Sequence, residues 1–208
     1  MHNILQWNCQ GYRSKYEDLR RILSVKHPAI ALLQETMLGD CTPRPPAGYS
    51  IHSSFNRPTP GHGLTTLIRK DIPHMNLQLQ TNLQATAFRI RLSQQYTICN
   101  IYLPPNMPIH LNDITNLINQ LPPPILLCGD FNSRHQLWDE TCTQQDARSR
   151  TIEHLLLNSS LALLNNGTAT HFHVQTGSNS AIDLSLCSAS NLTDLTWYIM
   201  DDLYRIIP

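Results

Sequence analysis

The sequence predicts an α/β fold in which mixed β-sheets are covered by helices. Short strand-like segments recur along the chain, and helical segments separate some of them. Between Arg69 and Leu103, however, strand-like runs follow one another with only turn residues between them, which indicates hairpins. Hairpins require antiparallel pairing, so a purely parallel wound sheet is not expected.

The predicted strands are short apolar runs bounded by turn residues. We expect strands over residues 3–8, 29–34, 49–53, 64–69, 86–92, 96–103, 125–129, 161–165 and 181–187.

Three segments carry helical signals. Residues 14–27 open with a capping box of Ser14 and Glu17, continue with apolar residues at helical spacing and stop before a proline. Residues 110–121 place their apolar side chains on one stripe, and a run of prolines ends that helix. Residues 150–159 form the third predicted helix, so the helices lie between predicted strands.

Composition indicates one domain over residues 1–208 and no bulk affinity for polyanions. The 15 Lys and Arg residues balance the 15 Asp and Glu residues, so any contact with nucleic acid must be local. The chain has six cysteines without a C-x-x-C pair, which favours reduced, buried thiols and no disulfide partner. No segment resembles a signal peptide or a membrane span, so we expect an intracellular protein without a membrane partner.

Polar residues follow the apolar runs at several predicted strand ends. The segments are "ILQWN", ending at Asn8, "IALLQE", ending at Gln34 and Glu35, "TICNIY", ending at Tyr102, and "ILLCGDFN", ending at Asp130 and Asn132. Neighbouring strands that deliver these ends to one edge of a sheet would create a ligand-binding crevice there.

Each of these residues has a structural explanation as well. Asn8 could turn the chain, Glu35 could be the first polar residue after a buried strand, and Tyr102 could be a half-buried aromatic at the rim. Asp130 and Asn132 could form an Asx-turn that caps the strand. These explanations stay open at the level of single residues.

Asp183, in "SAIDLSL", is harder to explain structurally. Its side chain shares a strand face with Ser185 and lies opposite Ile182 and Leu184. An internal strand would therefore place a carboxylate inside the protein, which is costly without a partner. A cation or a hydrogen-bonded network would supply that partner.

The chemistry of this set of side chains favours a hard divalent cation. Carboxylate and amide oxygens, without a cysteine or histidine cluster at transition-metal spacing, are typical of Mg²⁺ or Mn²⁺ sites. Such cations also bind phosphate oxygens, so the set indicates metal-assisted attack on a phosphorus centre.

Taken in order, the motifs resemble the endonuclease/exonuclease/phosphatase superfamily, and most closely the apurinic-type endonuclease domain of jockey-like non-LTR retrotransposons. The motifs are "QWNCQG", "LLQET", "NIYLPP", "LLCGDFNSRH", "LLNNGTATHFH" and "SAIDLSLCS". The resemblance covers essentially the whole chain. It implies a four-layer α-β-β-α sandwich of two mixed sheets, and a domain that nicks DNA in the nucleus beside a reverse transcriptase domain.

The resemblance also implies a role for each motif residue. Glu35 would be the principal metal ligand and Asn8 would organise the metal and its waters. Tyr102 would contact the scissile phosphate. Asp130 would position or deprotonate the attacking water, and Asn132 would hold the phosphate in the transition state.

The remaining implied roles concern residues later in the chain. Asp183 would orient and charge a catalytic histidine. Thr170 and His171 match a position that lies near bound DNA in the family.

The C-terminal residues depart from the family pattern. Members end with a Ser-Asp-His step on the last core strand, whereas this sequence ends in Arg205, Ile206, Ile207 and Pro208. We therefore expect an incomplete domain that lacks this strand and has weak or no nuclease activity. The alternatives are a metal-dependent phosphatase of the same superfamily and a non-catalytic nucleic-acid-binding remnant.

Overall fold

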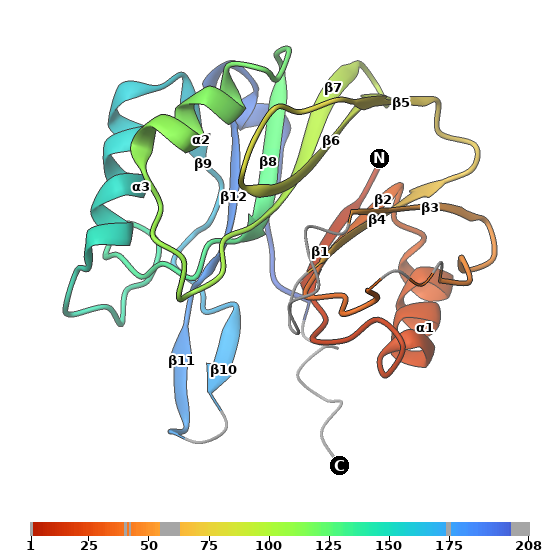
Figure 1. The fold of residues 1–208 in the computed structure, drawn as a ribbon, viewed down its shortest axis with the longest axis horizontal. Helices are drawn as coiled ribbons and strands as arrows, with labels where there is room; N and C mark the ends of the chain where they lie inside the picture. The colour runs from red at the N-terminus through yellow and green to blue at the C-terminus, as the bar shows by residue number, and fades with distance from the viewer. Residues whose placement is uncertain (1, 40, 42, 55–62, 174–175, 201–208) are drawn as a thin grey trace.

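The computed structural model describes the chain except residues 1, 40, 42, 55–62, 174–175 and 201–208. In the described part, two large mixed sheets stack face to face and helices cover both outer faces (Figure 1). This arrangement confirms the predicted four-layer sandwich. The expectation of a missing last strand concerns residues 201–208, which lie outside the described residues.

The first sheet joins the N-terminal strands to a hairpin. Its strands, in spatial order, are β1 (Ile4–Asn8), β2 (Ile30–Gln34), β4 (Leu64–Arg69) and β3 (Tyr49–Ser54). The β1–β2 pair is parallel and the other two pairs are antiparallel. Helix α1 (Tyr16–Lys26) connects the parallel pair and packs on the outer face of the sheet.

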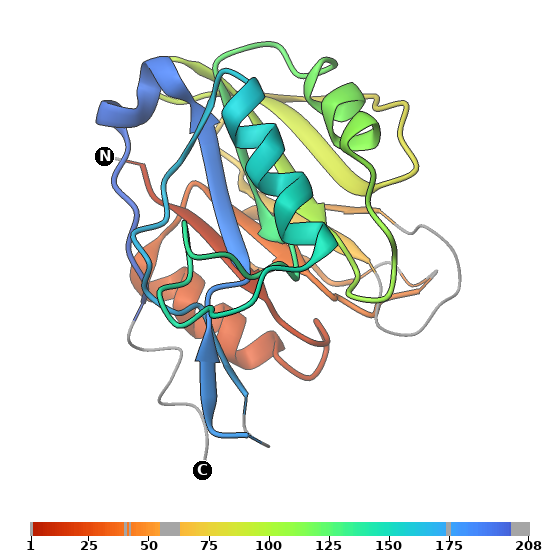
Figure 2. The same ribbon diagram turned by 90° about the vertical axis from the view of Figure 1, so that its left-hand side faces the viewer.

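The second sheet is larger and carries two helices. Its strands, in spatial order, are β5 (His74–Leu77), β6 (Gln84–Arg91), β7 (Gln95–Tyr102), β8 (Ile125–Asp130), β12 (Asp183–Ser188) and β9 (Leu161–Leu163). The β7–β8 pair is parallel, and α2 (Leu111–Ile118) lies in the crossover between them. Together with α3 (Ala147–Asn158), α2 covers the outer face of this sheet (Figure 2).

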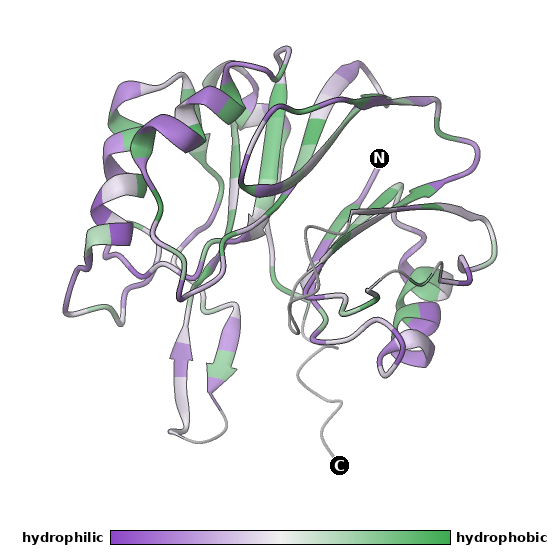
Figure 3. Cartoon of the chain, in the orientation of Figure 1, coloured by the Kyte–Doolittle hydropathy of each residue, from purple (hydrophilic) through white to green (hydrophobic). Residues whose placement is uncertain are grey.

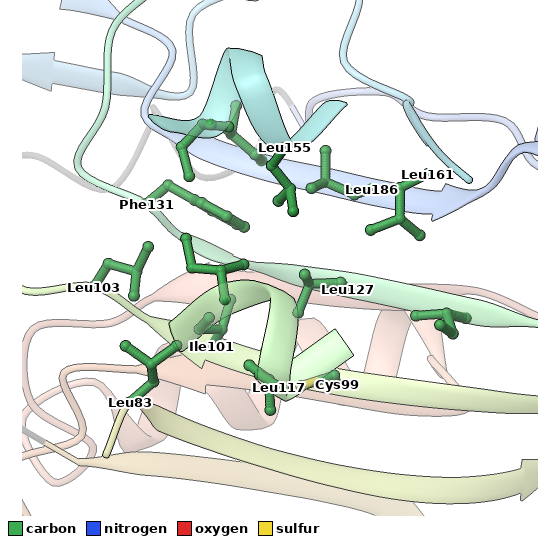
Figure 4. Close-up of a cluster of buried hydrophobic side chains, with 14 of the residues drawn as sticks. Leu83, Cys99, Ile101, Leu103, Leu117, Leu127, Phe131, Leu155, Leu161 and Leu186 are labelled. Carbon is green, nitrogen blue, oxygen red and sulfur yellow. The ribbon is translucent and has the colours of Figure 1, made fainter. Parts of the chain in front are cut away.

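Hydrophobic side chains fill the three spaces between the four layers. Hydropathy colouring of the cartoon marks many hydrophobic residues along the strands, whereas the helices carry both hydrophobic and hydrophilic residues (Figure 3). Under α2 and α3, Leu117 and Leu155 meet Ile101, Leu127 and their neighbours from the strands below (Figure 4). Burial of these apolar surfaces is the main force that holds the layers together.

Three features of the described structure were not predicted. The short hairpin of β10 (His171–His173) and β11 (Ser178–Ser180) projects from the body of the sandwich (Figure 1), and β5 and the 3-10 helix η1 (Ala189–Asp194) also escaped prediction. Strands of three residues with mixed polarity carry no usable periodicity.

The predicted capping box of α1 is wrong. The helix begins at Tyr16 rather than after Ser14, and its N-cap residue Lys15 makes no side-chain cap. The Ser14 hydroxyl donates instead to the carbonyl of Gly11, at 2.9 Å, so it is not available to the helix. A capping box does occur on α3, between Asp146 and Ser149, and that helix starts at Ala147 rather than residue 150.

The described residues contain no helix of the length and apolarity that crossing a lipid bilayer requires. All six cysteines are free thiols, of which Cys41 is exposed and the others are buried.

Gly129 is required by close packing within the second sheet. It lies inside β8 without a positive φ, so a left-handed backbone is not the reason for a glycine here. A Cβ atom at this position would collide with the backbone carbonyl of Ile101 on β7. The glycine therefore lets β7 and β8 approach each other directly before Asp130.

Replacing Gly129 with alanine is expected to destabilise the chain by about 2 kcal/mol or more, because backbone atoms must move to admit the methyl group. Urea denaturation would measure the loss. Gly177→Ala is the control: nothing lies within 4 Å of its added Cβ, so only its positive φ costs about 1 kcal/mol. Equal losses in the two variants would contradict this explanation of Gly129.

Candidate active site

The inner faces of the two sheets change from apolar to polar at the same end of the sandwich. Side chains alternate along a strand, so every second residue faces the opposite sheet. On β8 these residues are Leu126 and Cys128, which belong to the apolar cluster between the sheets, and then Asp130. The carboxylate thus follows the buried apolar residues on the same face.

Other strands repeat this pattern. Tyr102 pairs with Asp130 across the parallel β7–β8 ladder, and Asp183 pairs with Asp130 across β8–β12. The polar side chains that occupy this end of the inner faces are Gln6, Asn8, Gln34, Asn100, Tyr102, Asp130, Asp183 and Ser185. Strand register therefore brings together residues that lie far apart in the sequence.

The amide of Asn8 joins carboxylates from both sheets. Its Nδ2 donates to Glu35 Oε1 at 2.8 Å and to Asp130 Oδ2 at 2.7 Å. Glu35 directly follows β2 of the first sheet, whereas Asp130 ends β8 of the second. Asn8 Oδ1 also accepts a bond from the backbone N–H of Gln10 at 3.3 Å, so the turn that the sequence left open is present as well.

Glu35 has a strained backbone and a second donor. Its φ of 50° lies in the left-handed region that non-glycine residues seldom adopt. The Tyr102 hydroxyl donates to Glu35 Oε1 at 2.9 Å. Burial and the nearby charge of Glu35 raise the pKa of Tyr102, so the phenol stays protonated and remains a donor.

Asp130 and Asn132 form the Asx-turn that the sequence allowed. The backbone N–H of Asn132 donates to Asp130 Oδ1 at 2.8 Å, and Asn132 has a φ of 46°. Burial raises the pKa of Asp130 to about 6, and the hydrogen bonds from Asn8 and Asn132 act against that rise. This carboxylate is 1% exposed and is a stronger base than an ordinary aspartate.

Asp183 is held at the start of β12. Burial and, to a smaller extent, the charge of Asp130 raise its pKa to about 8. Gln6 Nε2 donates to Asp183 Oδ1 at 3.1 Å. The Thr170 hydroxyl accepts bonds from the backbone N–H groups of Ile182 and Asp183, both at 3.1 Å, and thereby fixes this strand end.

These side chains surround a pocket of about 400 Å³. Six of the eight residues that the sequence singled out line it: Asn8, Glu35, Asp130, Asn132, His171 and Asp183. The other two, Tyr102 and Thr170, contact Glu35 and the backbone of Asp183. The structure therefore brings all eight positions together, whereas their chemical roles stay predictions.

Sequence reasoning missed several residues of the pocket and its support. Gln6 lies two residues before Asn8, so strand alternation could have placed it on the same face. Arg134 and His173 lie within the motifs "LLCGDFNSRH" and "LLNNGTATHFH", and both line the pocket. Gln34, which the sequence grouped with Glu35, is instead fully buried and donates to Asn100 Oδ1 at 2.7 Å.

The donor set fits a magnesium-type cation. Glu35, Asp130 and Asp183 line one pocket, and the negative charges of their neighbours raise the pKa of Asp183. Both hydrogen bonds that the Glu35 carboxylate accepts from described residues reach Oε1, which leaves Oε2 for another ligand. The described residues contain no closed group of three or more His, Cys, Asp or Glu ligands; Mg²⁺ commonly binds one or two carboxylates and keeps several waters.

Two stacked mixed sheets with carboxylates at one end define an endonuclease/exonuclease/phosphatase-type sandwich, and comparison with known proteins agrees. The model of the endonuclease-reverse transcriptase family matches residues 96–204, which is more than half of the chain. The chain therefore belongs to this family. The resemblance inferred from the motifs is confirmed.

Individual relatives are similar at low identity. A probable RNA-directed DNA polymerase from transposon BS of Drosophila melanogaster is 24% identical over 191 residues, which cover 88% of this chain and 21% of that protein. A second Drosophila melanogaster protein, the probable RNA-directed DNA polymerase from transposon X-element, is 23% identical over the same coverage. The chain thus spans about a fifth of the length of these relatives.

Solved structures share the fold. The endonuclease domain of TRAS1, a telomere-specific non-LTR retrotransposon, has a TM-score of 0.80 at 23% identity and covers 97% of this chain and 92% of its own. An AP endonuclease from Leishmania major has a TM-score of 0.72 at 12% identity and covers 92% of this chain and 80% of its own. These likenesses confirm the four-layer architecture.

The raised pKa of Asp183 predicts a pH-dependent stability. Its folded pKa of about 8 lies above the unfolded value, which is about 4. The contribution of this group to stability is therefore full below about pH 4 and is lost as the pH rises through about 8. Asp183→Asn, which stays neutral, should raise the melting temperature of the metal-free chain by about 5 °C or more at pH 9 and little at pH 4.

Thermal unfolding in EDTA between pH 4 and pH 9 would measure this difference. Glu17→Gln serves as the control, because Glu17 is exposed and pairs with Arg20 on the surface, and it should follow the wild-type profile. A constant difference between Asp183→Asn and the wild type at every pH would contradict the prediction.

Proposed function

We propose that this chain is the endonuclease domain of a retrotransposon polyprotein and that it hydrolyses phosphodiester bonds in DNA weakly, with the help of Mg²⁺ or Mn²⁺. The observation that carries the proposal is the convergence of Glu35, Asp130 and Asp183 on one pocket, where the amide of Asn8 joins the first two. The transposon origin of the relatives supports DNA as the substrate and a reverse transcriptase domain as the partner. Action on chromosomal DNA would take place in the nucleus.

Glu35 and Asn8 form the proposed cation site. Glu35 would be the principal ligand, because Asn8 and Tyr102 fix its carboxylate through Oε1. Asn8 would orient that ligand and the waters around it, as residues behind metal ligands commonly do. The bound cation would supply charge stabilisation at the phosphate and template the substrate.

Asp130 would receive the proton of the attacking water. Its pKa of about 6 leaves it largely ionised at neutral pH and still a better base than an exposed aspartate. The bond from Asn8 to Oδ2 and the bond from the Asn132 backbone to Oδ1 fix both oxygens. The carboxylate is thus held rigidly, which favours a water in one orientation.

Tyr102 and Asn132 would bind the phosphate group. The Tyr102 hydroxyl has one O–H, which donates to Glu35 Oε1 at 2.9 Å and would turn to the phosphate when DNA binds. The Asn132 amide uses one N–H for the Leu103 carbonyl, at 3.2 Å, and its second N–H would bond the phosphate. Fixed donors of this kind stabilise charge that develops in a transition state. For Asp183 the family resemblance implies the orientation of a catalytic histidine, and Thr170 and His171 would lie beside bound DNA.

Loss of the Glu35 carboxylate should abolish most of the activity. Glu35→Gln is expected to nick supercoiled plasmid at least about 100-fold more slowly than the wild type, with enzyme in excess and Mg²⁺ present, because one positioned group is typically worth about that factor or more. Agarose gel separation of supercoiled and open-circular plasmid would measure the rate. Glu17→Gln, an exposed surface change, should nick at the wild-type rate.

Two results would contradict the proposal. Nicking by Glu35→Gln at the wild-type rate would exclude Glu35 as a ligand. Release of inorganic phosphate from small phosphate esters, without any nicking of plasmid, would assign the site to a phosphatase.

A further inference from the structure

Arg134 stands apart from the other residues of the pocket by its charge. Among the described residues that line the pocket, it is the one arginine or lysine, and it shares the lining with the carboxylates of Glu35, Asp130, Asp146 and Asp183. A DNA phosphate that enters so acidic a pocket meets electrostatic repulsion. The chain has no net positive charge to offset it, so attraction must come from single, well-placed cations.

The guanidinium of Arg134 is held from one side. Its Nε donates to Asp139 Oδ2 at 3.0 Å, and its Nη2 donates to the hydroxyl of Thr141 at 3.2 Å. Its Nη1 makes no hydrogen bond with any described residue. The Arg134 side chain is 46% exposed, whereas that of Asp139 is 2% exposed, so the free edge of the guanidinium is accessible to a ligand.

Asp139 is a rigid anchor that does not depend on Arg134. Its Oδ1 accepts from the backbone N–H and the hydroxyl of Thr141, and its Oδ2 accepts from the backbone N–H of Ala181. Burial acts to raise the pKa of Asp139, but the bonds from Thr141, Arg134 and Ala181 together lower it. The carboxylate is therefore ionised, and it ties the segment after β8 to the start of β12.

A purely structural role does not account for this arrangement. Asp139 already accepts three bonds from Thr141 and Ala181, so the buried carboxylate would stay satisfied without Arg134. A half-exposed ion pair contributes at most about 1 kcal/mol to stability. Yet the pair holds a long, flexible side chain at the pocket, and an ordered guanidinium loses less entropy when it binds a phosphate.

We propose that Arg134 binds a phosphate of the DNA backbone at the edge of the pocket and that Asp139 and Thr141 are positioning residues for its guanidinium. This inference rests on the proposed function for one point, namely that DNA is the ligand; it does not require that the chain cleaves DNA. An arginine presents parallel N–H donors that match phosphate oxygens, and a phosphate contact of this kind sets the position of the backbone without reading its sequence.

Salt-dependent binding tests the proposal without any turnover. The full chain in EDTA is titrated with a fluorescent DNA duplex at several KCl concentrations. Arg134→Ala should weaken binding about tenfold at low salt, and it should reduce the slope of log K against log salt by about one, as expected for one lost phosphate contact. Arg134→Lys should retain most of the slope because it retains the charge.

Arg91→Ala is the matched control, because it also removes one positive charge, but at the end of β6 that lies away from the pocket. Arg91 pairs with Gln95, whereas Gln84 at the opposite end pairs with Tyr102 beside the pocket. This control should leave both the affinity and the slope unchanged. Equal behaviour of Arg134→Ala and Arg91→Ala, or absence of any DNA binding by the wild type, would overturn the proposal.

The positioning role of Thr141 has a separate test. Thr141→Val removes the hydroxyl that accepts from Arg134, and it should weaken binding about threefold with an unchanged salt slope, because the charge is still present. In the Arg134→Ala background the same change should have no further effect. Additive losses would instead indicate a general structural role and overturn the assignment.

These outcomes separate the two proposals. Loss of binding in Arg134→Ala without detectable nicking by the wild type would support the phosphate contact and contradict the nuclease function. Nicking by the wild type, together with unaltered DNA binding by Arg134→Ala, would support the nuclease function and contradict the phosphate contact.

Discussion

The paired hydrogen bonds of the Asn8 amide are the interaction on which the rest of the site depends. One NH₂ group donates to Glu35 from the first sheet and to Asp130 from the second. An amide has two N–H donors and no net charge, so it can bridge two carboxylates without neutralising either. Glu35 and Asp130 thereby lie close together between the stacked sheets, and the amide adds no positive charge to either carboxylate.

This bridge belongs to a layer of polar contacts between the two sheets. Gln34 donates to Asn100, whose own amide donates to the backbone carbonyls of Leu33 and Thr65 at 3.2 and 3.4 Å. Gln6 donates to Asp183 in the same way. Buried polar groups need such partners, and this layer separates the apolar interior of the sandwich from the pocket. At the end of the sandwich that carries the pocket, polar contacts therefore replace apolar packing and hold the charged side chains in place.

The sequence was most informative where neighbouring strands of one sheet determine the outcome. Tyr102 and Asp130 end apolar runs, and strand alternation with parallel pairing suffices to bring them to one edge. The need for a glycine at position 129 could not be predicted, because it arises from the close approach of Ile101, which no local pattern encodes. Ser14 was misassigned because its hydroxyl bonds the preceding turn, and local bonds of serine compete with capping.

Contacts between the sheets could not be predicted. The partners of Gln6 and Asn100 depend on how the two sheets are aligned, and strand periodicity carries no information about that alignment. Asp139 and Arg134 lie on the irregular segment between β8 and α3, where no period applies. The hairpin that carries His171 and His173 was missed because its strands have three residues each.

Proton release on binding of Mg²⁺ tests most directly the claim that this polar end is a cation site. Asp183, with a pKa of about 8, is largely protonated at pH 7, and a nearby cation should expel that proton. Calorimetric titration of the metal-free chain with Mg²⁺ at pH 7, in buffers of different ionisation enthalpy, counts the protons released. We expect release of about one proton for each Mg²⁺ bound. Binding without proton release, or no binding at millimolar Mg²⁺, would contradict the account.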